Sequence, residues 1–416
     1  MQKSIICSEI NGVVTAPSSK SIVQRCIAAA LLAEGTSFFH NVTLCADDQA
    51  ALRVAETLGA SCEVNGNEMQ ITGGHFPRGS ILDCGESGLA LRMFAAIAAR
   101  YDIEIVLTGG NSLLRRPIDM IISPLRTLGA NCQTSSRRLP LIIKGPLHGG
   151  AVTIDGSVSS QFLTGLLIVL PTLKPDSVVN VENLKSRPYI DLTLQILKKF
   201  GINTVNHGFR QFYIHGNQRY LPVDYTIEGD WSGAAFLLVA GALQGEVTVT
   251  GLNLTSAQAD RKILEALRIC GAKIELLSNA IKVSQAPLHA FEFDATDCPD
   301  LFPPLVVLAT GCCGTSRISG VERLFFKESN RAAALCQEFQ RLGIEIAIAG
   351  NQMYITGGTI QGGRVRAHND HRIAMALAIA GLRSSQPVII EGSECIVKSY
   401  PSFFEDLKQI GGKVYE

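Results

Sequence analysis

Cationic and hydroxyl side chains recur at the starts of the apolar helices that the sequence predicts. In PSSKSIVQR (residues 17–25), Ser18 or Ser19 can cap a helix, yet Lys20 and Arg25 follow at the end where the helix dipole favours acids. Six further predicted helix starts carry such groups: Arg92; Arg115 and Arg116; Ser159, Ser160 and Gln161; Lys327, Glu328 and Arg331; Asn369, Asp370, His371 and Arg372; and Lys398. Helix N-termini flanked by Lys and Arg bind phosphate and carboxylate. A lone cation at such an end is usually solvated, but together they predict a cleft for small polyanions between two domains whose helix ends point inward.

Two acids stand apart from the other carboxylates of the chain. Asp300 precedes an apolar helix in DCPDLFPPL, and Glu328 lies between Lys327 and Arg331. Acids held in a cationic cleft can accept and donate protons. The alternatives are a helix cap for Asp300 and an ion-paired surface side chain for Glu328, and the residues alone favour these slightly.

Other catalytic patterns have less support. The serines lack a G-x-S-x-G elbow, so capping or hydrogen bonding to a substrate fits them better than nucleophilic attack. His371 is either a general base or a structural hydrogen-bonding residue, and TGGTIQGG lacks the Walker spacing. The remaining candidate acids are expected to cap helices: Asp47, Asp48, Glu228 and Asp230.

Length and composition restrict the class of protein. A chain of 416 residues suggests two domains of roughly 200 residues each. The formal net charge is zero, which argues against nucleic acid or an anionic membrane as a partner. Twelve cysteines in apolar stretches, with no signal peptide and no C-x-x-C pair, predict buried reduced thiols in a cytosolic protein and give a zinc site little support. The longest apolar runs are too short to span a membrane.

Two phrases repeat along the chain at intervals of about 70 residues. One ends a helix with Gly and starts two short strands, at residues 58–74, 128–145, 200–216, 270–284 and 342–358, with a truncated copy at 410–416. The other is a strand entered through turn residues, at 35–42, 101–109, 176–183, 245–252, 314–321 and 386–393. The sequence therefore predicts six units of mixed strands and helices, an α/β (α+β) fold.

The ends of the chain predict how these units group. The sixth unit lacks its final strand, while residues 3–14 form a strand with no helix before it. The N-terminal strand is therefore expected to complete the C-terminal domain. We predict an N-terminal domain of three units over 19–224 and a C-terminal domain formed by 1–18 and 225–416.

Several motifs in combination resemble the 5-enolpyruvylshikimate-3-phosphate synthase (3-phosphoshikimate 1-carboxyvinyltransferase) family of enolpyruvyl transferases. They run through the whole chain: KSIVQR, RRP, DGSVSSQFLTGLL, SRPYID, EGDWSGAAF, PDLFP, KESNR and NDHRIAMA. The resemblance implies a two-domain inside-out α/β barrel of six βαβαββ repeats, with the active site in the interdomain cleft. It implies transfer of the enolpyruvyl group of phosphoenolpyruvate to the 5-hydroxyl of shikimate 3-phosphate, with release of phosphate, in aromatic amino-acid biosynthesis. It further implies no metal or organic cofactor, and we expect a cytoplasmic monomer.

The resemblance also implies roles for individual residues. Those implied to bind shikimate 3-phosphate are Lys20, Ser21, Arg25, Ser159, Ser160, Gln161, Ser186, Asp300 and Lys327. Those implied to bind phosphoenolpyruvate are Lys20, Gly88, Arg116, Gln161, Arg331, Arg372 and Lys398. Asp300 is implied to accept the proton of the 5-hydroxyl, and Glu328 with Lys20 to deliver a proton to the methylene carbon.

The chain departs from the family pattern at Glu86 and Leu89, where Asn and Thr are commoner, and at Arg323, where many members have Asn. An acid at position 86 would oppose phosphoenolpyruvate unless it is paired or turned away. Three other functions stay open on the residues: a UDP-N-acetylglucosamine enolpyruvyl transferase, although no Cys lies near NSLLRRP; an RNA 3′-terminal phosphate cyclase, against which the neutral charge argues; and a non-catalytic polyanion-binding protein.

Overall fold

The computed structural model describes residues 1–110, 112–135 and 138–416, and they divide into two compact units. Unit 1 comprises Met1–Ser19 and Glu228–Glu416, and unit 2 comprises Lys20–Ile227. Both boundaries differ slightly from those predicted. Ser19 lies in unit 1, where its N–H donates to the Glu228 carbonyl at 2.9 Å. Residues 225–227 lie in unit 2 because the strand that contains Tyr225 pairs with a strand of that unit.

Unit 2 contains three four-stranded sheets. In spatial order they are β14 (Asp224–Thr226), β3 (Gly35–His40), β5 (Glu68–Gly73) and β4 (Ser61–Asn65); β6 (Ile81–Asp83), β7 (Glu104–Thr108), β9 (Leu141–Lys144) and β8 (Asn131–Thr134); and β10 (Ala151–Asp155), β11 (Ser177–Glu182), β13 (Gln211–Ile214) and β12 (Thr204–His207).

Unit 1 contains three more four-stranded sheets and a short pair, β18 (Leu288–His289) with β20 (Cys312–Cys313). The sheets are β2 (Ile10–Thr15), β15 (Gly245–Thr250), β17 (Ala280–Ser284) and β16 (Lys273–Leu276); β19 (Glu292–Asp294), β21 (Thr315–Ser319), β23 (Gln352–Thr356) and β22 (Ile346–Ala349); and β24 (Gly363–Arg366), β25 (Val388–Glu391), β1 (Gln2–Ile6) and β26 (Lys413–Tyr415).

All six sheets share one pairing pattern. The first two strands are parallel, and the third is antiparallel to both the second and the fourth. The sixth sheet takes its third strand, β1, from the start of the chain. The six-fold repetition read from the sequence is therefore present in the hydrogen-bonded sheets.

The prediction of a single strand over residues 3–14 is wrong. This segment forms β1 and β2, which belong to different sheets. The chain leaves the sheet that contains β1 near Ser8. The Ser8 hydroxyl donates to the Ile6 carbonyl at 3.0 Å, and its N–H donates to the Leu382 carbonyl at 3.1 Å. Such local side-chain bonds compete with strand pairing and turn the chain.

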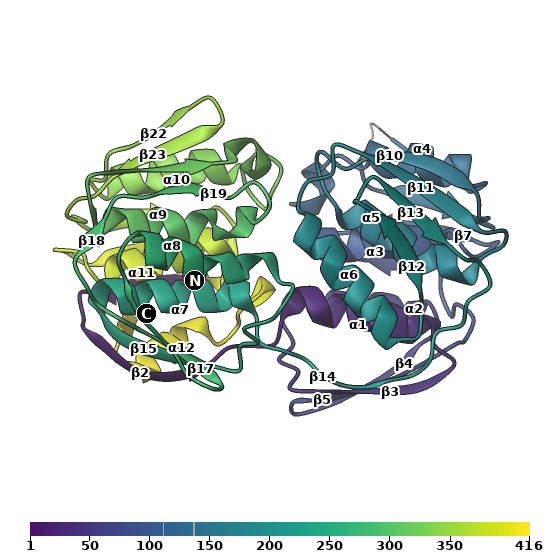
Figure 1. Cartoon of the computed structure of the whole chain (residues 1–416), viewed down its shortest axis with the longest axis horizontal. Coiled ribbons are helices and arrows are strands. Elements are labelled where there is room, and N and C mark those ends of the chain that lie inside the picture. Colours follow the sequence, from purple (N-terminus) through teal and green to yellow (C-terminus); the bar gives the residue numbers. More distant parts are fainter. Residues whose placement is uncertain (111, 136–137) are drawn as a thin grey trace. The chain divides into compact units, whose positions relative to one another are not determined.

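The first helix of each repeat is apolar on nearly all sides and is buried, as expected for such a helix. These helices are α1 (Lys20–Leu32), α3 (Gly88–Ala98) and α5 (Gln161–Val169) in unit 2, and α7 (Trp231–Gln244), α9 (Phe302–Thr310) and α11 (His371–Gly381) in unit 1. Within unit 2, α3 packs on α1 and α5, and within unit 1, α9 packs on α7 and α11. Figure 1 shows these helices inside each unit, with strands on its outer side.

The second helix of each repeat carries more polar residues and buries only part of its surface. These helices are α2 (Ala46–Thr57), α4 (Asp119–Thr127), α6 (Arg187–Lys199), α8 (Ile263–Ile269), α10 (Arg331–Arg341) and α12 (Phe403–Gln409). Short 3₁₀ helices complete the description: η1 (Leu113–Arg115), η2 (Leu170–Thr172), η3 (Ala259–Lys262), η4 (Pro299–Leu301), η5 (Val321–Leu324) and η6 (Ser393–Lys398).

The cysteines follow the sequence prediction. All twelve lie in the described ranges as free thiols, and eight of them are buried. Burial raises the pKa of Cys132 to about 11. Among the described residues, none of the helices has the length and apolar character that crossing a membrane requires.

Candidate active site

Lys20 begins α1 in unit 2 and is paired with an acid of the next helix. Its ammonium lies 2.9 Å from the carboxylate of Asp47, in the first turn of α2. The neighbouring Asp48 accepts the N–H of Cys45 at 3.2 Å and so caps α2, as predicted. Asp47, in contrast, is an ion-pair partner that holds Lys20 at the helix start.

Arg25 is buried one turn further along α1. Its Nε donates to Thr193 Oγ1 at 2.9 Å, and its Nη1 donates to the Ser21 carbonyl at 2.7 Å. Its Nη2 donates to the Tyr189 carbonyl at 3.3 Å. Burial lowers the pKa of Arg25 to about 10, so the side chain stays charged at neutral pH. These bonds fix the guanidinium between α1 and α6.

Two guanidinium groups meet at the start of α3. A Cβ at Gly88 would lie 2.5 Å from Arg116 Nη1 and 2.8 Å from Arg92 Nη1, so the glycine lets both guanidinium groups approach the backbone in this arrangement. Arg92 Nη1 also donates to Gln161 Oε1 at 2.7 Å, at the start of α5. Two cations and an amide thus converge on one helix N-terminus, an arrangement suited to a carboxylate or phosphate.

The serine residues of unit 2 lie at the starts of α5 and α6. Ser159 Oγ accepts the N–H of Gln161 at 3.2 Å, and Ser160 is buried as the residue before the helix. Ser186 precedes α6 with a φ of 57°, the left-handed region that residues other than glycine seldom adopt. Such conformations concentrate at functional sites, where the surrounding structure holds them in place.

In unit 1, Arg331 forms the centre of a network of charges. Its buried guanidinium lies 2.9 Å from Asp300, 2.6 Å from Glu328 and 2.9 Å from Asp370. Asp300 is further paired with Lys327 at 3.2 Å and with Arg372 at 3.2 Å. We call these residues the Arg331 cluster: Asp300, Lys327, Glu328, Arg331, Asp370 and Arg372.

The Arg331 cluster contains as many cations as carboxylates, and these opposite charges shift one another's pKa values. Burial acts to raise the pKa of the Asp300 carboxyl, but its three cationic neighbours outweigh burial and hold that pKa well below its usual range. Burial lowers the pKa of Lys327, partly offset by the charge of Asp300. Asp300 is therefore ionised, and Asp300 and Glu328 both belong to a charge network rather than serving as a helix cap and a surface side chain.

The last two predicted groups lie beside the start of α11. Asp370 accepts the N–H of Arg372 at 3.0 Å and caps that helix, whose first residue, His371, is buried. Lys398, at the end of η6, donates to the Asn369 carbonyl at 2.8 Å. The ammonium of Lys398 is thus tied to the loop that leads into α11.

A comparison with known protein families agrees with the cationic and acidic groups found at the helix starts of units 1 and 2. The family model described as EPSP synthase (3-phosphoshikimate 1-carboxyvinyltransferase) matches residues 6–407. The chain belongs to the EPSP synthase family.

Curated relatives and solved structures of this family cover the chain almost completely. The protein named 3-phosphoshikimate 1-carboxyvinyltransferase of Clostridium novyi is 37% identical over 99% of this chain and 98% of its own length. The protein of that name from Aeropyrum pernix is 38% identical over 98% and 95%. The EPSP synthase structure from Acinetobacter baumannii matches with a TM-score of 0.83 at 26% identity, covering both chains fully. The enolpyruvyl transferase NikO of Streptomyces tendae, at 17% identity, covers 100% of this chain and 98% of its own with the same TM-score, and shares the fold.

Within each unit, the structure brings together most of the residues singled out from the sequence of this EPSP synthase family member. Gly88, Arg116 and Gln161 gather in unit 2, and five residues gather in unit 1: Asp300, Lys327, Glu328, Arg331 and Arg372. Three contributors are not among the predicted site residues: Arg92, Asp47 and Asp370. Arg92 lies one helical turn after Gly88, a spacing that was visible in the sequence, whereas the pairing of Asp47 with Lys20 joins two helices and has no local signal.

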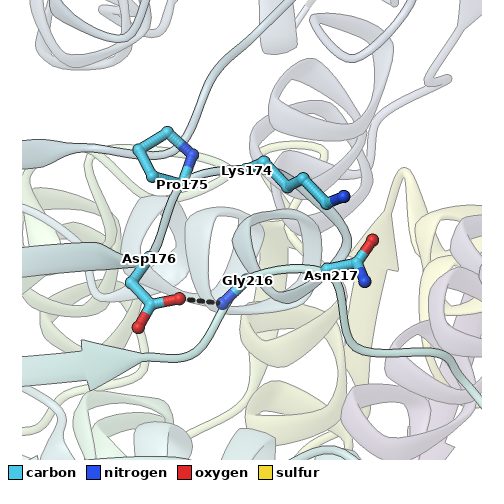
Figure 2. Close-up of a pocket in the computed structure, with 5 residues that line it drawn as sticks. All are labelled: Lys174, Pro175, Asp176, Gly216 and Asn217. Atoms are coloured by element: carbon cyan, nitrogen blue, oxygen red, sulfur yellow. Dashed lines mark hydrogen bonds between the residues drawn. The ribbon is translucent and has the colours of Figure 1, made fainter.

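A surface pocket elsewhere in unit 2 contains none of these residues. It is lined by Lys174, Pro175, Asp176, Gly216 and Asn217, where the Asp176 carboxylate accepts the Gly216 N–H at 2.9 Å (Figure 2). The residues that could hold anions or move protons lie at or near the ends of the helices described above, and this pocket contains none of them.

Proposed function

We propose that this protein transfers the enolpyruvyl group of phosphoenolpyruvate to the 5-hydroxyl of shikimate 3-phosphate and releases inorganic phosphate, as an enzyme of aromatic amino-acid biosynthesis. The observation that carries the proposal is the family match over residues 6–407, with relatives named for this activity at 37–38% identity over nearly the full chain. The side chains at the buried helix starts support it independently.

Unit 2 supplies anion-binding groups in this proposal. Shikimate 3-phosphate is bound by hydroxyl, amide and cationic groups at the starts of α1, α5 and α6, namely Lys20, Ser21, Arg25, Ser159, Ser160, Gln161 and Ser186. Phosphoenolpyruvate is bound where Arg116 and Gln161 converge on Gly88, together with Lys20. Both substrates are polyanions, so their repulsion must be offset by convergent cations and helix ends.

Unit 1 supplies the acid–base groups and further cations. Glu328, with Lys20, delivers a proton to the methylene carbon of phosphoenolpyruvate, which leaves a cationic carbon. The 5-hydroxyl oxygen bonds to that carbon while Asp300 takes its proton. One methyl proton then returns to Glu328 with Lys20, its bonding electrons re-form the double bond, and the carbon–oxygen bond to phosphate breaks, so that phosphate leaves with that electron pair. Four cations offset the negative charge of the substrates. Lys327 binds shikimate 3-phosphate, and Arg331, Arg372 and Lys398 bind phosphoenolpyruvate.

The charge network around Asp300 fits a base that is activated by substrate. Three cations stabilise its ionised form, so it is a weak base in the free protein. When anionic substrates engage Lys327, Arg331 and Arg372, less positive charge remains for Asp300, and its affinity for a proton rises. The substrates themselves thus help to generate the base.

We further propose the finer architecture that this mechanism requires. In each unit the three repeats form an inside-out α/β barrel, and the two sets of helix starts act on one pair of substrates in a cleft between the units. A shared site is part of this proposal because the mechanism uses Lys20 of unit 2 together with Asp300 and Glu328 of unit 1. The cytoplasmic location and the monomeric state stay predictions.

A phosphate-release assay tests the activity. The protein is incubated with phosphoenolpyruvate and either shikimate 3-phosphate or UDP-N-acetylglucosamine, and inorganic phosphate is followed. Release with shikimate 3-phosphate alone is the expected outcome. Release with UDP-N-acetylglucosamine would assign the rival enolpyruvyl transfer, and release with neither acceptor would favour a non-catalytic polyanion-binding protein.

A further inference from the structure

Glu86, an acid where the family pattern favours Asn, is turned toward a neighbouring loop. It lies in the turn before α3, two residues before Gly88. Its Oε1 accepts the backbone N–H of Ser112 at 3.4 Å, and its Oε2 accepts the Ser112 hydroxyl. One carboxylate thus binds both donors of a single residue.

The two loops are shaped around this contact. A Cβ at residue 110 would collide with the Glu86 carboxylate, so Gly110 leaves the space that the carboxylate fills. The Gly110 N–H also donates to the Gly85 carbonyl at 2.6 Å, a second link between the same loops. The loop that contains Glu86 and the loop that contains Gly110 thus both fit the Glu86 carboxylate in this position.

The residue that Glu86 holds leads directly to a predicted phosphoenolpyruvate ligand. Ser112 is the N-cap of η1, and the residue that follows η1 is Arg116. The N–H of Arg116 donates to the Leu113 carbonyl at 3.1 Å, so the backbone of the arginine is bonded to the short helix. Arg116 Nη1 in turn lies against Gly88, two residues beyond Glu86.

We propose that Glu86 is a positioning residue: by binding Ser112 it fixes η1 and sets the Arg116 guanidinium against Gly88, where it meets the carboxylate or phosphate of phosphoenolpyruvate. This inference rests on the proposed function. A carboxylate near an anion site weakens binding through charge repulsion. Glu86 compensates by holding an anion ligand in its binding geometry before the substrate arrives, which lowers the cost of binding.

The direction in which Glu86→Ala changes KM for phosphoenolpyruvate shows whether Glu86 positions Arg116 or acts only through its charge. If Glu86 acted only through its charge, Glu86→Ala would make the site more positive and lower KM for phosphoenolpyruvate, and Ser112→Ala would change nothing. If Glu86 positions Arg116, both variants raise that KM by about five- to thirtyfold. KM for shikimate 3-phosphate and kcat then change by less than about threefold, because the other ligands stay in place.

A double-variant cycle and a conservative variant complete the test. Because the two residues share one contact, the Glu86→Ala/Ser112→Ala protein should be no worse than the poorer single variant. Glu86→Gln keeps an acceptor for the N–H and a donor for the hydroxyl, so it should stay within about threefold of wild type. A lower KM in Glu86→Ala, or additive losses in the double variant, would overturn the proposal.

The outcome is separable from that of the proposed function. Calorimetric titration with inorganic phosphate needs no turnover, and each variant is first shown to melt cooperatively. A wild-type protein that turns over neither acceptor, but binds phosphate at least about fivefold more tightly than Ser112→Ala does, refutes the function and keeps the positioning role. Equal phosphate affinity in the wild type and in both single variants refutes the positioning role, and if Glu86→Ala fails to fold, Ser112→Ala alone decides.

Discussion

Asp300 illustrates how a single carboxylate can be both stable and reactive. Three cationic side chains lie within 3.2 Å of its oxygens. In the free protein they stabilise the negative charge, so the group needs no proton at any physiological pH. The proposed mechanism assigns the same cations to the substrates, so we expect Asp300 to gain basicity only when substrate is present.

We expect Asp300→Asn to fold normally and to lower kcat by about 10²-fold or more, the scale of a lost general base. The amide keeps the size of the side chain but cannot take the hydroxyl proton. Steady-state phosphate release measures the effect. The matched control is Asp294→Asn in the same unit, an exposed acid whose carboxylate accepts the Thr296 N–H at 2.9 Å. Equal kcat values in the two variants would remove Asp300 from the mechanism.

Asp48 is a buried acid whose ionisation is costly. It accepts the N–H and S–H of Cys45, at 3.2 and 3.1 Å. Burial nevertheless raises its pKa from 3.8 to about 7. Between these values the folded protein binds a proton that the unfolded chain has released, so the contribution to stability is full below about pH 4 and is lost as pH rises through about 7.

We therefore expect the free energy of unfolding of the wild type to fall between pH 4.5 and pH 8, with Asp48 contributing on the order of 3 kcal/mol. Asp48→Asn removes that contribution and flattens the profile. Urea unfolding at several pH values measures both. Asp102→Asn, at an exposed acid of the same unit, should retain the wild-type slope. A wild-type slope in Asp48→Asn would show that burial does not control this carboxyl.

At the scale of elements, the buried helices explain where the chemistry lies. A helix that is apolar on all sides leaves only its ends for polar groups, and its N-terminus offers unpaired N–H groups. Repetition places such ends at α1, α3 and α5 in one unit and at α9 and α11 in the other. The local pattern of small apolar residues after a charged start made these ends predictable from the sequence.

The partners of these ends could not be predicted in the same way. Lys20 of α1 pairs with Asp47 of α2, and Arg331 of α10 pairs with Asp370, which precedes α11. Each pair therefore joins two different elements. Periodicity and capping signals describe one element at a time, whereas these contacts depend on how elements pack. The family resemblance supplied candidate roles for Asp300 and Glu328, but it did not supply Asp47, which holds Lys20, or Asp370, the third acid that holds Arg331.

The loop before α11 depends on a buried acid of α10. Glu338 accepts the Arg366 N–H at 3.0 Å and bonds the His368 ring at 2.7 Å. His368 and Asn369 both adopt positive φ, which is unfavourable for such residues unless their surroundings hold them. Glu338 thus holds the strained segment that precedes Asp370 of the Arg331 cluster.

We expect Glu338→Ala to lower the free energy of unfolding by about 2–4 kcal/mol, because it leaves a cavity at a buried position and removes the acceptor of two part-buried donors. Arg341→Ala removes another partner of the same carboxylate, at 3.3 Å, but its side chain is 43% exposed. That change should cost less than about 1 kcal/mol. Denaturant unfolding compares the two, and similar losses would mean that the loop does not depend on Glu338.

At the scale of the molecule, the chain passes between the units twice, and at each passage the last strand before it completes a sheet of the unit that the chain is leaving. β2 precedes α1 but pairs with β15 in unit 1, and β14 precedes α7 but pairs with β3 in unit 2. The repeated phrases predicted six units, because strand alternation and Gly caps are local signals. They could not divide residues 3–14 into two strands, since the division depends on contacts with Leu382 and with β15.

Each four-stranded sheet lies within one unit, so a change in the relation of the units would break no sheet, and we expect the proposed chemistry to involve such a change. Lys20 lies in unit 2, whereas Asp300 and Glu328 lie in unit 1. All three must act on one substrate pair, and excluding water strengthens every charge interaction that they make. We expect the radius of gyration of Asp300→Asn, which holds both substrates with slow turnover, to fall when both are present. Small-angle scattering with neither, one and both substrates measures this change, and profiles that superimpose in all three states would refute closure while leaving the assignment of the anion ligands intact.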